Sequence, residues 1–337
     1  MGNSLNVAVL GATGAVGQEF VRLFEQRKWP INELRLLASE RSVGKRQAFA
    51  GRNLCVELAA PEAFAGIDVA FFSAGASRSR EFAPEAVVRG ATVIDNSSAF
   101  RMDPAVPLVV PEINFDAIQP GTKLVANPNC TAIVLLMAVA PLRALGKIER
   151  IVMSSYQSAS GAGALAMDEL VEQSKVILAG GKAEPVQFPH QCAFNVFSHN
   201  TPIDETGYNE EERKVIAESR KILGDPDLKI NVTCVRVPVL RAHSESITVE
   251  FSGPAPSVES VRKALSGAPG VKVIDDRATN TFPMPVVASG QDDVFVGRIR
   301  QDLSNPNAVC LFASGDQLLK GAALNAVQIG ERMLGLS

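Results

Sequence analysis

Leu5-Asn-Val-Ala-Val-Leu-Gly-Ala-Thr-Gly-Ala-Val-Gly17 is the stretch that decides the fold of the first half of this chain. Its first six residues are an apolar run typical of a buried strand, and apolar side chains recur at helical spacing after the glycines. In such a strand–turn–helix unit the glycines permit a tight turn and bring the backbone close to a pyrophosphate, and the helix N-terminus offers N–H groups to the phosphates. The stretch predicts a dinucleotide site made by Gly11, Thr13, Gly14, Ala15, Val16 and Gly17.

The strands that follow extend this interpretation. Buried runs at 33–38, 68–75 and 92–95 alternate with helical stretches as far as residue 130, a pattern typical of a doubly wound parallel sheet. Ser73 and Gly75 stand at the end of one of these strands, where small residues suit contact with a nucleotide. Both are predicted cofactor contacts.

The choice between NADP and NAD depends on the residues after the second strand. An NAD site places an acid there to bind the ribose 2′-hydroxyl, whereas this chain reads Ser39-Glu-Arg-Ser42. Ser39, Arg41 and Ser42 supply donors, and a guanidinium can neutralise a 2′-phosphate, so NADP is favoured. Glu40 keeps NAD open, because its carboxylate either faces solvent or holds a ribose hydroxyl.

Cys130 has an unusual position. Leu124-Val-Ala-Asn-Pro-Asn-Cys130 joins an apolar run to a helix predicted over 131–145, and Pro128 keeps Asn127 out of the helical region. A helix N-terminus stabilises an anion, which favours the thiolate of a cysteine placed there. The alternative is a small hydrophobic residue in a packed core.

Arg101 lies on a polar loop after the strand at 92–95. An arginine in that position can bind an anion with two parallel hydrogen bonds, and the alternative is a solvated surface arginine.

The second half of the chain has a different character. Strands are predicted at 148–158, 229–239 and 246–251, a hairpin joins 293–300 to 308–314, and helices are predicted at 164–178, 210–223 and 318–334. We expect a mixed or antiparallel sheet with helices on one side. The loop from Gly180 to about Glu205 is long enough to suggest a functional or interface segment.

Composition excludes several classes of protein. Hydrophobic residues make up 46% and charged residues 20% of the 337 positions, the net charge is −3, and no basic stripe points to nucleic acid. No apolar run has the length of a membrane span. The five cysteines and three histidines lack the spacing of a disulfide framework or a metal site. We expect a reduced, metal-free, cytoplasmic protein without nucleic-acid or membrane partners.

Several motifs in order along the chain closely resemble the aspartate-semialdehyde dehydrogenase family: the glycine-rich turn, Asn127-Pro-Asn-Cys130, Tyr156-Gln-Ser-Ala-Ser-Gly-Ala-Gly163, and Arg236 followed by Arg241-Ala-His243. The likeness spans nearly the whole chain. It implies an α/β fold with an N-terminal Rossmann-type doubly wound parallel sheet, plus an α+β catalytic and dimerisation domain with a mixed sheet. It also implies that the NADP-binding domain is 1–129, completed by a C-terminal helix at 315–337, and that the catalytic and dimerisation domain is 130–314.

The resemblance assigns residue roles. Cys130 would be the nucleophile, His243 the acid/base, Gln157 the group that orients the substrate, and Asn129 a support for the acyl intermediate. Substrate contacts would come from Arg236 and Glu211, phosphate contacts from Arg101 and Lys214, and further cofactor contacts from Ser160, Gly161 and Asn325. The implied reaction interconverts L-aspartate-β-semialdehyde and L-β-aspartyl phosphate through a Cys130 thioester, with NADP and phosphate, in lysine, threonine and methionine biosynthesis. The implied assembly is a homodimer or homotetramer.

The same chemistry follows from the residue types. A thiolate adds to an aldehyde, a hydride leaves, and phosphate cleaves the resulting thioester. A substrate carrying both charges of an amino acid calls for one cation and one anion, as Arg236 and Glu211 supply. Each residue also has a structural alternative: a satisfied core histidine at 243, a structural ion pair at Arg236, and a Glu211–Lys214 pair on a solvated helix.

Rival functions remain open at the level of sequence. A reductase of N-acetyl-glutamyl phosphate shares the fold, cysteine and cofactor, but it typically has glycine before the cysteine, where this chain has Asn129. Glyceraldehyde-3-phosphate dehydrogenase has a serine-cysteine-threonine context that is absent here. A non-catalytic NADP-binding sensor would have no need of Cys130, Gln157, Arg236 and His243 together.

Overall fold

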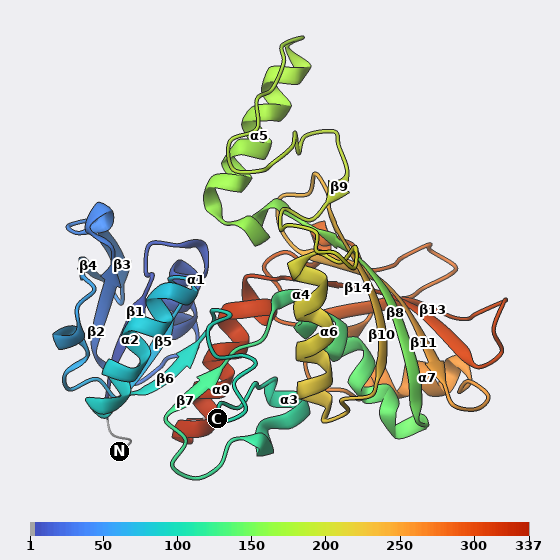
Figure 1. Cartoon of the computed structure of the whole chain (residues 1–337), viewed down its shortest axis with the longest axis horizontal. Coiled ribbons are helices and arrows are strands. Elements are labelled where there is room, and N and C mark those ends of the chain that lie inside the picture. Colours follow the sequence, from blue (N-terminus) through green and yellow to red (C-terminus); the bar gives the residue numbers. More distant parts are fainter. Residues whose placement is uncertain (1–3, 337) are drawn as a thin grey trace. The chain divides into compact units, whose positions relative to one another are not determined.

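The computed structural model describes residues 4–336, and the chain divides into two compact units (Figure 1). One unit is Met1–Asn129 with Ala322–Ser337, and the other is Cys130–Gly321.

The first unit is built on a seven-stranded sheet, ordered β3-β4-β2-β1-β5-β6-β7. Its strands are β1 (Leu5–Leu10), β2 (Ile31–Ala38), β3 (Arg46–Phe49), β4 (Arg52–Leu58), β5 (Val69–Phe72), β6 (Thr92–Asp95) and β7 (Leu124–Ala126). All neighbouring strands pair in parallel except β3 with β4. The doubly wound parallel sheet predicted from sequence is therefore confirmed, with an added hairpin at one edge that the sequence pattern did not indicate.

Helices and short turns connect these strands. They are α1 (Ala15–Gln26), α2 (Ala76–Val88), α3 (Pro111–Asn114) and α9 (Leu324–Leu334), with 3-10 turns η1 (Glu40–Ser42), η2 (Pro61–Phe64) and η3 (Phe115–Ala117). The glycine-rich turn between β1 and α1 requires its glycines. Gly11 has φ of 89°, and a Cβ there would overlap the carbonyl oxygen of Ser73. A Cβ at Gly17 would overlap the carbonyl oxygen of Gly11.

Helix α9 is tied to the first unit by one buried carboxylate. Glu331 accepts hydrogen bonds from Arg27 Nε and Nη2, both at 2.7 Å, and from Trp29 Nε1 at 3.1 Å. The sequence predicts a single helix over 318–334, and the structure instead has a π-helical turn, η6 (Leu319–Ala323), before α9 begins at Leu324.

The second unit is built on another seven-stranded sheet, ordered β12-β13-β14-β11-β8-β10-β9. Its strands are β8 (Ile148–Gln157), β9 (Phe197–Ser198), β10 (Lys229–Arg236), β11 (His243–Phe251), β12 (Val271–Val273), β13 (Val294–Gln301) and β14 (Ala308–Gly315). The pairs β8–β10 and β12–β13 are parallel and the other neighbours are antiparallel. The predicted mixed sheet and its β13–β14 hairpin are confirmed.

Helices of the second unit are α4 (Cys130–Val139), α5 (Ala164–Leu178), α6 (Glu210–Leu223), α7 (Val258–Ser266) and α8 (Pro285–Ala288), with 3-10 turns η4 (Ala140–Leu145) and η5 (Ala159–Ala162). Helix α4 packs against β11, β14 and α6, and α6 packs against β10. The predicted helix over 131–145 ends as an α-helix at Val139, since Pro141 cannot supply an interior N–H, and continues as η4.

Strand register arranges the buried face of this sheet in rows. Arg236 lies opposite Gln157, and two residues earlier Cys234 lies opposite Ser155, which also faces Glu245 on β11. The sequence places His243 before a strand starting at 246, but β11 begins at His243 because its pairing with β14 continues to His243 opposite Gly315. The strand backbone therefore fixes His243 directly.

Glu245 is a buried acid on β11, two residues after His243 and opposite Ser155. It is fully buried, and within residues 4–336 neither carboxyl oxygen has a hydrogen-bond partner. Burial raises the pKa of Glu245 well above its usual value, so the folded protein favours the neutral carboxylic acid. Below the pKa of the unfolded state both states are protonated. As pH rises through that value only the unfolded chain ionises, and the free energy of unfolding falls.

We therefore expect Glu245→Gln to raise the melting temperature, by about 2 °C or more at pH 8 and by less at pH 5. The matched control is Glu250→Gln on the same strand, where the half-buried carboxylate pairs with Arg150 at 3.0 Å and should give no gain. Calorimetry at both pH values measures the effect. A Glu245→Gln gain that is equal at both pH values would contradict the explanation.

Candidate active site

Cys130 is the first residue of α4, and three residues separate it from the end of β7. The prediction of a strand-to-helix junction is confirmed. The thiol is partly exposed, whereas Cys192 and Cys234 are buried. Burial raises the pKa of Cys192 to about 11, which makes that thiol a poor nucleophile at neutral pH.

Thr131, the residue after Cys130, connects α4 to Gln157 and Glu211. Gln157 Nε2 donates to Thr131 Oγ1 at 2.8 Å, to Ser155 Oγ at 3.3 Å and to Glu211 Oε1 at 3.4 Å. Thr131 Oγ1 lies 3.5 Å from the same Glu211 oxygen. Gln157 is thus held at the end of β8 by α4 and α6 together, beside the start of the cysteine helix.

Arg236 is a fully buried cation at the end of β10. Its acceptors include Asn200 Oδ1, 3.1 Å from Nη2, and the main-chain carbonyls of Gln157 and Ser158. His199 Nε2 lies 3.1 Å from Nη2. Burial, the largest cause, lowers the pKa of Arg236 from its usual value, and the charges of Cys130 and Glu211 oppose this shift.

The long loop at 180–205 supplies the residues around Arg236. Strand β9 pairs Phe197 with Arg236, and this pairing carries His199 and Asn200 to the guanidinium. Burial lowers the pKa of His199 to about 4, so this imidazole is neutral at pH 7. The sequence indicated that the loop has a function but did not identify these two residues, because no local pattern links them to β10.

His243 is fully buried, and one of its nitrogens is engaged. Nδ1 accepts the main-chain N–H of Ser158 at 3.1 Å and lies 3.1 Å from the Ser158 hydroxyl. Nε2 has no hydrogen-bond partner among the residues described. Burial, helped by the charges of Arg236 and His199, lowers the pKa of His243 well below its usual value.

Ser160 and Gly161 lie beside this histidine, on η5. Ser160 Oγ is 3.0 Å from Ser158 Oγ. A Cβ at Gly161 would lie 3.1 Å from His243 Nε2 and 3.4 Å from Arg236 Nη1, so the glycine leaves room at the unpartnered nitrogen.

Helix α6 carries both Glu211 and Lys214, but they do not form the pair considered from sequence. Lys214 Nζ binds Glu210 at 2.5 Å. Glu211 is buried and faces Thr131 and Gln157 instead. The helix begins with a capping box between Asn209 and Glu212, which fixes its first turn.

Arg101, Asn129 and Asn325 belong to the first unit together with Asn127. Arg101 is buried, and it donates from Nε to the Asn127 carbonyl at 2.9 Å and from Nη2 to the Asn96 carbonyl at 2.8 Å. Asn325 Nδ2 donates to Asn127 Oδ1 at 2.7 Å and to the Val109 carbonyl at 2.9 Å. These contacts hold the loop that leads to Asn129 in a defined shape.

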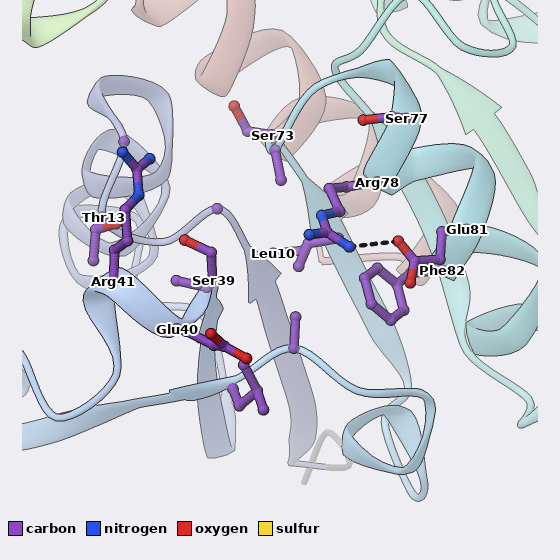
Figure 2. A pocket seen from close by; sticks show the side chains of 16 residues that line it. Leu10, Thr13, Ser39, Glu40, Arg41, Ser73, Ser77, Arg78, Glu81 and Phe82 are labelled. Atoms are coloured by element: carbon purple, nitrogen blue, oxygen red, sulfur yellow. Dashed lines mark hydrogen bonds and ion pairs between the residues drawn. The ribbon is translucent and has the colours of Figure 1, made fainter.

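A pocket of about 800 Å³ opens over the glycine-rich turn of the first unit (Figure 2). The predicted cofactor residues that line it are Gly11, Thr13, Gly14, Ser39, Arg41 and Ser73, and Glu40 lines it as well. Ser42 lies behind this lining and accepts a hydrogen bond from Thr13 Oγ1 at 3.1 Å. Ala15, Val16, Gly17 and Gly75 are likewise absent from the lining, as residues of α1 and the N-cap of α2.

Sequence analysis missed the opposite wall of this pocket. Ser77 and Arg78 line it from the first turn of α2, and Arg78 Nη1 binds Glu81 at 2.7 Å. Figure 2 shows this pair facing Ser39 and Glu40 across the pocket. The signal was present as Gly75-Ala-Ser-Arg78 directly after a buried strand, since a helix beginning there can present donors to an anion. The size, glycine backbone and donors of the pocket fit a dinucleotide.

No helix within residues 4–336 is long and apolar enough to cross a membrane. Over the same residues, no group of three histidine, cysteine or acidic side chains is placed to hold a metal ion.

Comparison with known proteins agrees with both units. Residues 6–120 match the family model of the semialdehyde dehydrogenase NAD binding domain, and residues 139–320 match that of the semialdehyde dehydrogenase dimerisation domain. An aspartate-semialdehyde dehydrogenase of Prochlorococcus marinus is 53% identical over 330 residues, which are 98% of this chain and 96% of the relative. One of Synechocystis is 52% identical, over 99% of this chain and 98% of the relative.

A solved structure gives the same result. The crystal structure of aspartate semialdehyde dehydrogenase II from Vibrio cholerae, complexed with ASA, is 41% identical, covers 99% of both chains and superposes with a TM-score of 0.95. Full-length matches at this identity extend across both units and the segments that carry Cys130, Gln157, Arg236 and His243. The chain belongs to the aspartate-semialdehyde dehydrogenase family.

Proposed function

We propose that the protein interconverts L-aspartate-β-semialdehyde and L-β-aspartyl phosphate through a thioester on Cys130. The observation that carries this proposal is the arrangement around the first turn of α4. There one unit holds a partly exposed cysteine, a buried cation at Arg236, a buried acid at Glu211 and an imidazole with one unpartnered nitrogen. The ASA complex of the Vibrio cholerae relative supports the same class of substrate.

Substrate recognition follows from the two buried charges. Arg236 is a guanidinium whose contacts include carbonyl oxygens and a ring nitrogen, so its positive charge is available to an α-carboxylate. Glu211 Oε1 lies within 3.5 Å of two neutral polar groups, Thr131 and Gln157, and its negative charge suits an ammonium group. An amino acid can then bind with both charges matched, and Gln157 orients the chain between them.

The covalent steps centre on Cys130. Its thiolate attacks the aldehyde carbon, the C–S bond forms, and the carbonyl π pair moves to oxygen, which hydrogen-bonds with His243 Nε2. Hydride departs from that carbon with its electron pair, and the C=O bond of a thioester forms. A nicotinamide cofactor, which the pocket over the glycine-rich turn would hold, would supply the acceptor for this hydride, or its donor in the reverse direction. A phosphate oxygen then attacks the thioester carbon, the C–S bond breaks, and the thiolate is regenerated.

Arg101 and Lys214 are the proposed phosphate ligands, with Asn129 supporting the acyl group. Arg101 is buried and donates to two main-chain carbonyls, which fix the direction of its guanidinium. Lys214 is half-buried and pairs with the exposed Glu210, whose charge solvent screens, so a phosphate dianion can compete for the Lys214 ammonium.

NADP is the proposed cofactor. The pocket presents Arg41 and Arg78 as cations and Ser39 and Ser77 as hydroxyl donors where a 2′-phosphate would be bound. Arg78 already pairs with Glu81, so Arg41 is the arginine we expect to select the phosphate. Ser160, Gly161 and Asn325 remain proposed contacts to the nicotinamide half, and Glu40 is the residue that could restore use of NAD.

The first test is phosphate-dependent reduction of NADP⁺ with L-aspartate-β-semialdehyde. Cys130→Ala should lower kcat by at least about a thousandfold, because no other group can form the thioester. The matched control, Cys55→Ala, removes an exposed thiol from the other unit and should leave kcat unchanged. Activity that persists without phosphate, or in the Cys130 variant, would overturn the covalent mechanism.

A second test concerns cofactor choice. Arg41→Ala should raise KM for NADP⁺ by about tenfold or more, the effect of losing one charged hydrogen bond to phosphate, and should change KM for NAD⁺ less than about twofold. Arg46→Ala, an exposed arginine on β3 outside the pocket lining, is the control. Equal losses with both cofactors would show that Arg41 does not read the 2′-phosphate.

A homodimer is the proposed assembly. One face of the second sheet carries α4 and α6. The opposite face presents partly or fully exposed side chains from the four adjacent strands β10, β8, β11 and β14. These side chains are Val235, Ser154, Tyr156, Ser246 and Phe312. The match of residues 139–320 to a dimerisation domain supports a second copy as the occupant of this face.

Sedimentation should therefore give about twice the chain mass of 35.8 kDa. Ser154→Arg places a charge at the centre of the proposed contact and should shift the mass toward that of one chain. Val88→Arg, on the exposed surface of α2, should leave the mass unchanged. A monomeric wild-type protein at micromolar concentration would contradict the proposal.

A further inference from the structure

The hydrogen bonds behind His243 determine which of its nitrogens carries the proton. A main-chain N–H can only donate, so the 3.1 Å contact from Ser158 requires Nδ1 to be an unprotonated acceptor. In a neutral imidazole the hydrogen then lies on Nε2. Nε2 is also the nitrogen that has no hydrogen-bond partner among residues 4–336, and it lies in the space that Gly161 leaves open.

The donor that fixes Nδ1 is itself held firmly. The Gln157 carbonyl, in the same peptide unit as the Ser158 N–H, accepts Val237 N at 3.1 Å and Arg236 Nη1 at 3.4 Å. Hydrogen bonds to the carbonyl of a peptide polarise its N–H and strengthen it as a donor. A second hydrogen on Nδ1 would point at this N–H, so the contact opposes the imidazolium form.

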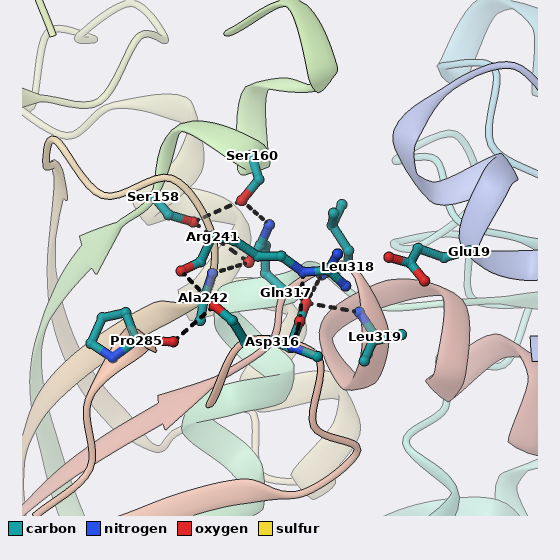
Figure 3. A network of polar contacts seen from close by, with 12 residues as sticks. Glu19, Ser158, Ser160, Arg241, Ala242, Pro285, Asp316, Gln317, Leu318 and Leu319 are labelled. Carbon is teal, nitrogen blue, oxygen red and sulfur yellow. Dashed lines mark hydrogen bonds and ion pairs between the residues drawn. The ribbon is translucent and has the colours of Figure 1, made fainter. Parts of the chain in front are cut away.

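Gln317 connects two chain segments, the turn with Ser158 and Ser160 and the residue before β11, Ala242 (Figure 3). Its Oε1 accepts the Ala242 N–H at 2.9 Å, directly before His243, and lies 3.5 Å from the Ser158 hydroxyl. Its Nε2 donates to Ser160 Oγ. One amide therefore holds both the strand start that carries His243 and the turn that contacts Nδ1.

The backbone at Ala242 needs this support. Ala242 has φ of 74°, in the left-handed region that disfavours any residue with a Cβ. Arg241 is anchored alongside, with Nε 2.7 Å from the buried carboxylate of Asp316. Strained backbone persists where its surroundings over-determine it, and it gathers at functional sites. Here the left-handed backbone at Ala242 sets the direction in which the His243 side chain points.

We propose that Gln317 and Ser158 are positioning residues that hold His243 as the neutral tautomer with its hydrogen on Nε2, aimed at the reacting oxygen. This inference rests on the proposed function for the identity of that oxygen. Nε2–H donates a hydrogen bond to the carbonyl as the Cys130 thiolate adds, and stabilises the negative charge that develops on oxygen. Because the attacking species is a thiolate, the oxygen can lose hydride from its carbon without first giving up a proton.

The experiment is ¹⁵N NMR of the histidine rings in the full-length protein near pH 7.5, where tautomers differ in the shifts of their two nitrogens. The three histidines of the chain make assignment practical, and His243→Asn identifies the signal. The wild type should show a protonated Nε2 and an unprotonated Nδ1 at His243. A hydrogen on Nδ1, or an imidazolium, would overturn the proposal whether or not the protein is active.

Variants test the positioning roles. Gln317→Ala should mix the two tautomers and lower kcat by about tenfold while KM for the semialdehyde stays within about twofold. Ser158→Ala keeps the main-chain donor, so it should retain the tautomer and lose only about two- to fivefold in kcat. Ser244→Ala is the matched control, because its buried hydroxyl bonds Ser314 at 3.2 Å and not the imidazole.

Two outcomes separate the inference from the proposed function. An unchanged His243 spectrum with unchanged kcat in Gln317→Ala would remove Gln317 from the positioning role and leave the thioester chemistry intact. Absence of wild-type activity with the expected tautomer would instead refute the proposed function and leave the assignment of the imidazole standing. If Gln317→Ala does not fold, the wild-type spectrum and Ser158→Ala still decide the tautomer.

Discussion

The buried charge of Arg236 organises the second unit more than any other single group. A guanidinium removed from water needs several acceptors, and here the Gln157 and Ser158 carbonyls, Asn200 and His199 surround it. Those contacts bring together the end of β8, the turn after it and the long loop at 180–205 that contains β9. The same positive charge helps to keep the pKa values of both nearby histidines low, so that the site presents one permanent cation beside neutral imidazoles.

The sequence predicted those parts of the structure that depend on residues close together in the chain. The β1–α1 turn was recognisable because only glycine fits where a Cβ at Gly11 would meet Ser73. Cys130 was placed at a helix start because Pro128 and the apolar runs on either side mark a junction within seven residues. Gln157 and Arg236 both lie in strands that the sequence predicts, but their position opposite each other comes from the parallel pairing of β8 with β10, which no local pattern indicates.

The remaining features depend on contacts between residues far apart in the chain. Nothing in Arg241-Ala-His243 reveals that Ala242 has a left-handed backbone, because the glutamine that stabilises it lies 75 residues later. The pairing of Lys214 with Glu210 rather than Glu211 is set by which side of α6 faces the sheet. The sequence does not predict the α2 wall of the dinucleotide pocket, because Arg78 comes to line it only through the pairing of β5 with β1.

His243 and Glu245 lie two residues apart on β11 and are both fully buried, but they have different surroundings and different roles. His243 has a fixed donor on one nitrogen and open space at the other, so its neutral form can direct a hydrogen bond at a ligand. Within residues 4–336 neither carboxyl oxygen of Glu245 has a hydrogen-bond partner, and burial favours its protonated form. A carboxylate there would raise the pKa of His243 and compete with Glu211 for an ammonium group. The neutral acid in the adjacent row therefore leaves Glu211 as the buried negative charge facing Gln157, which is the charge distribution that an amino-acid substrate requires.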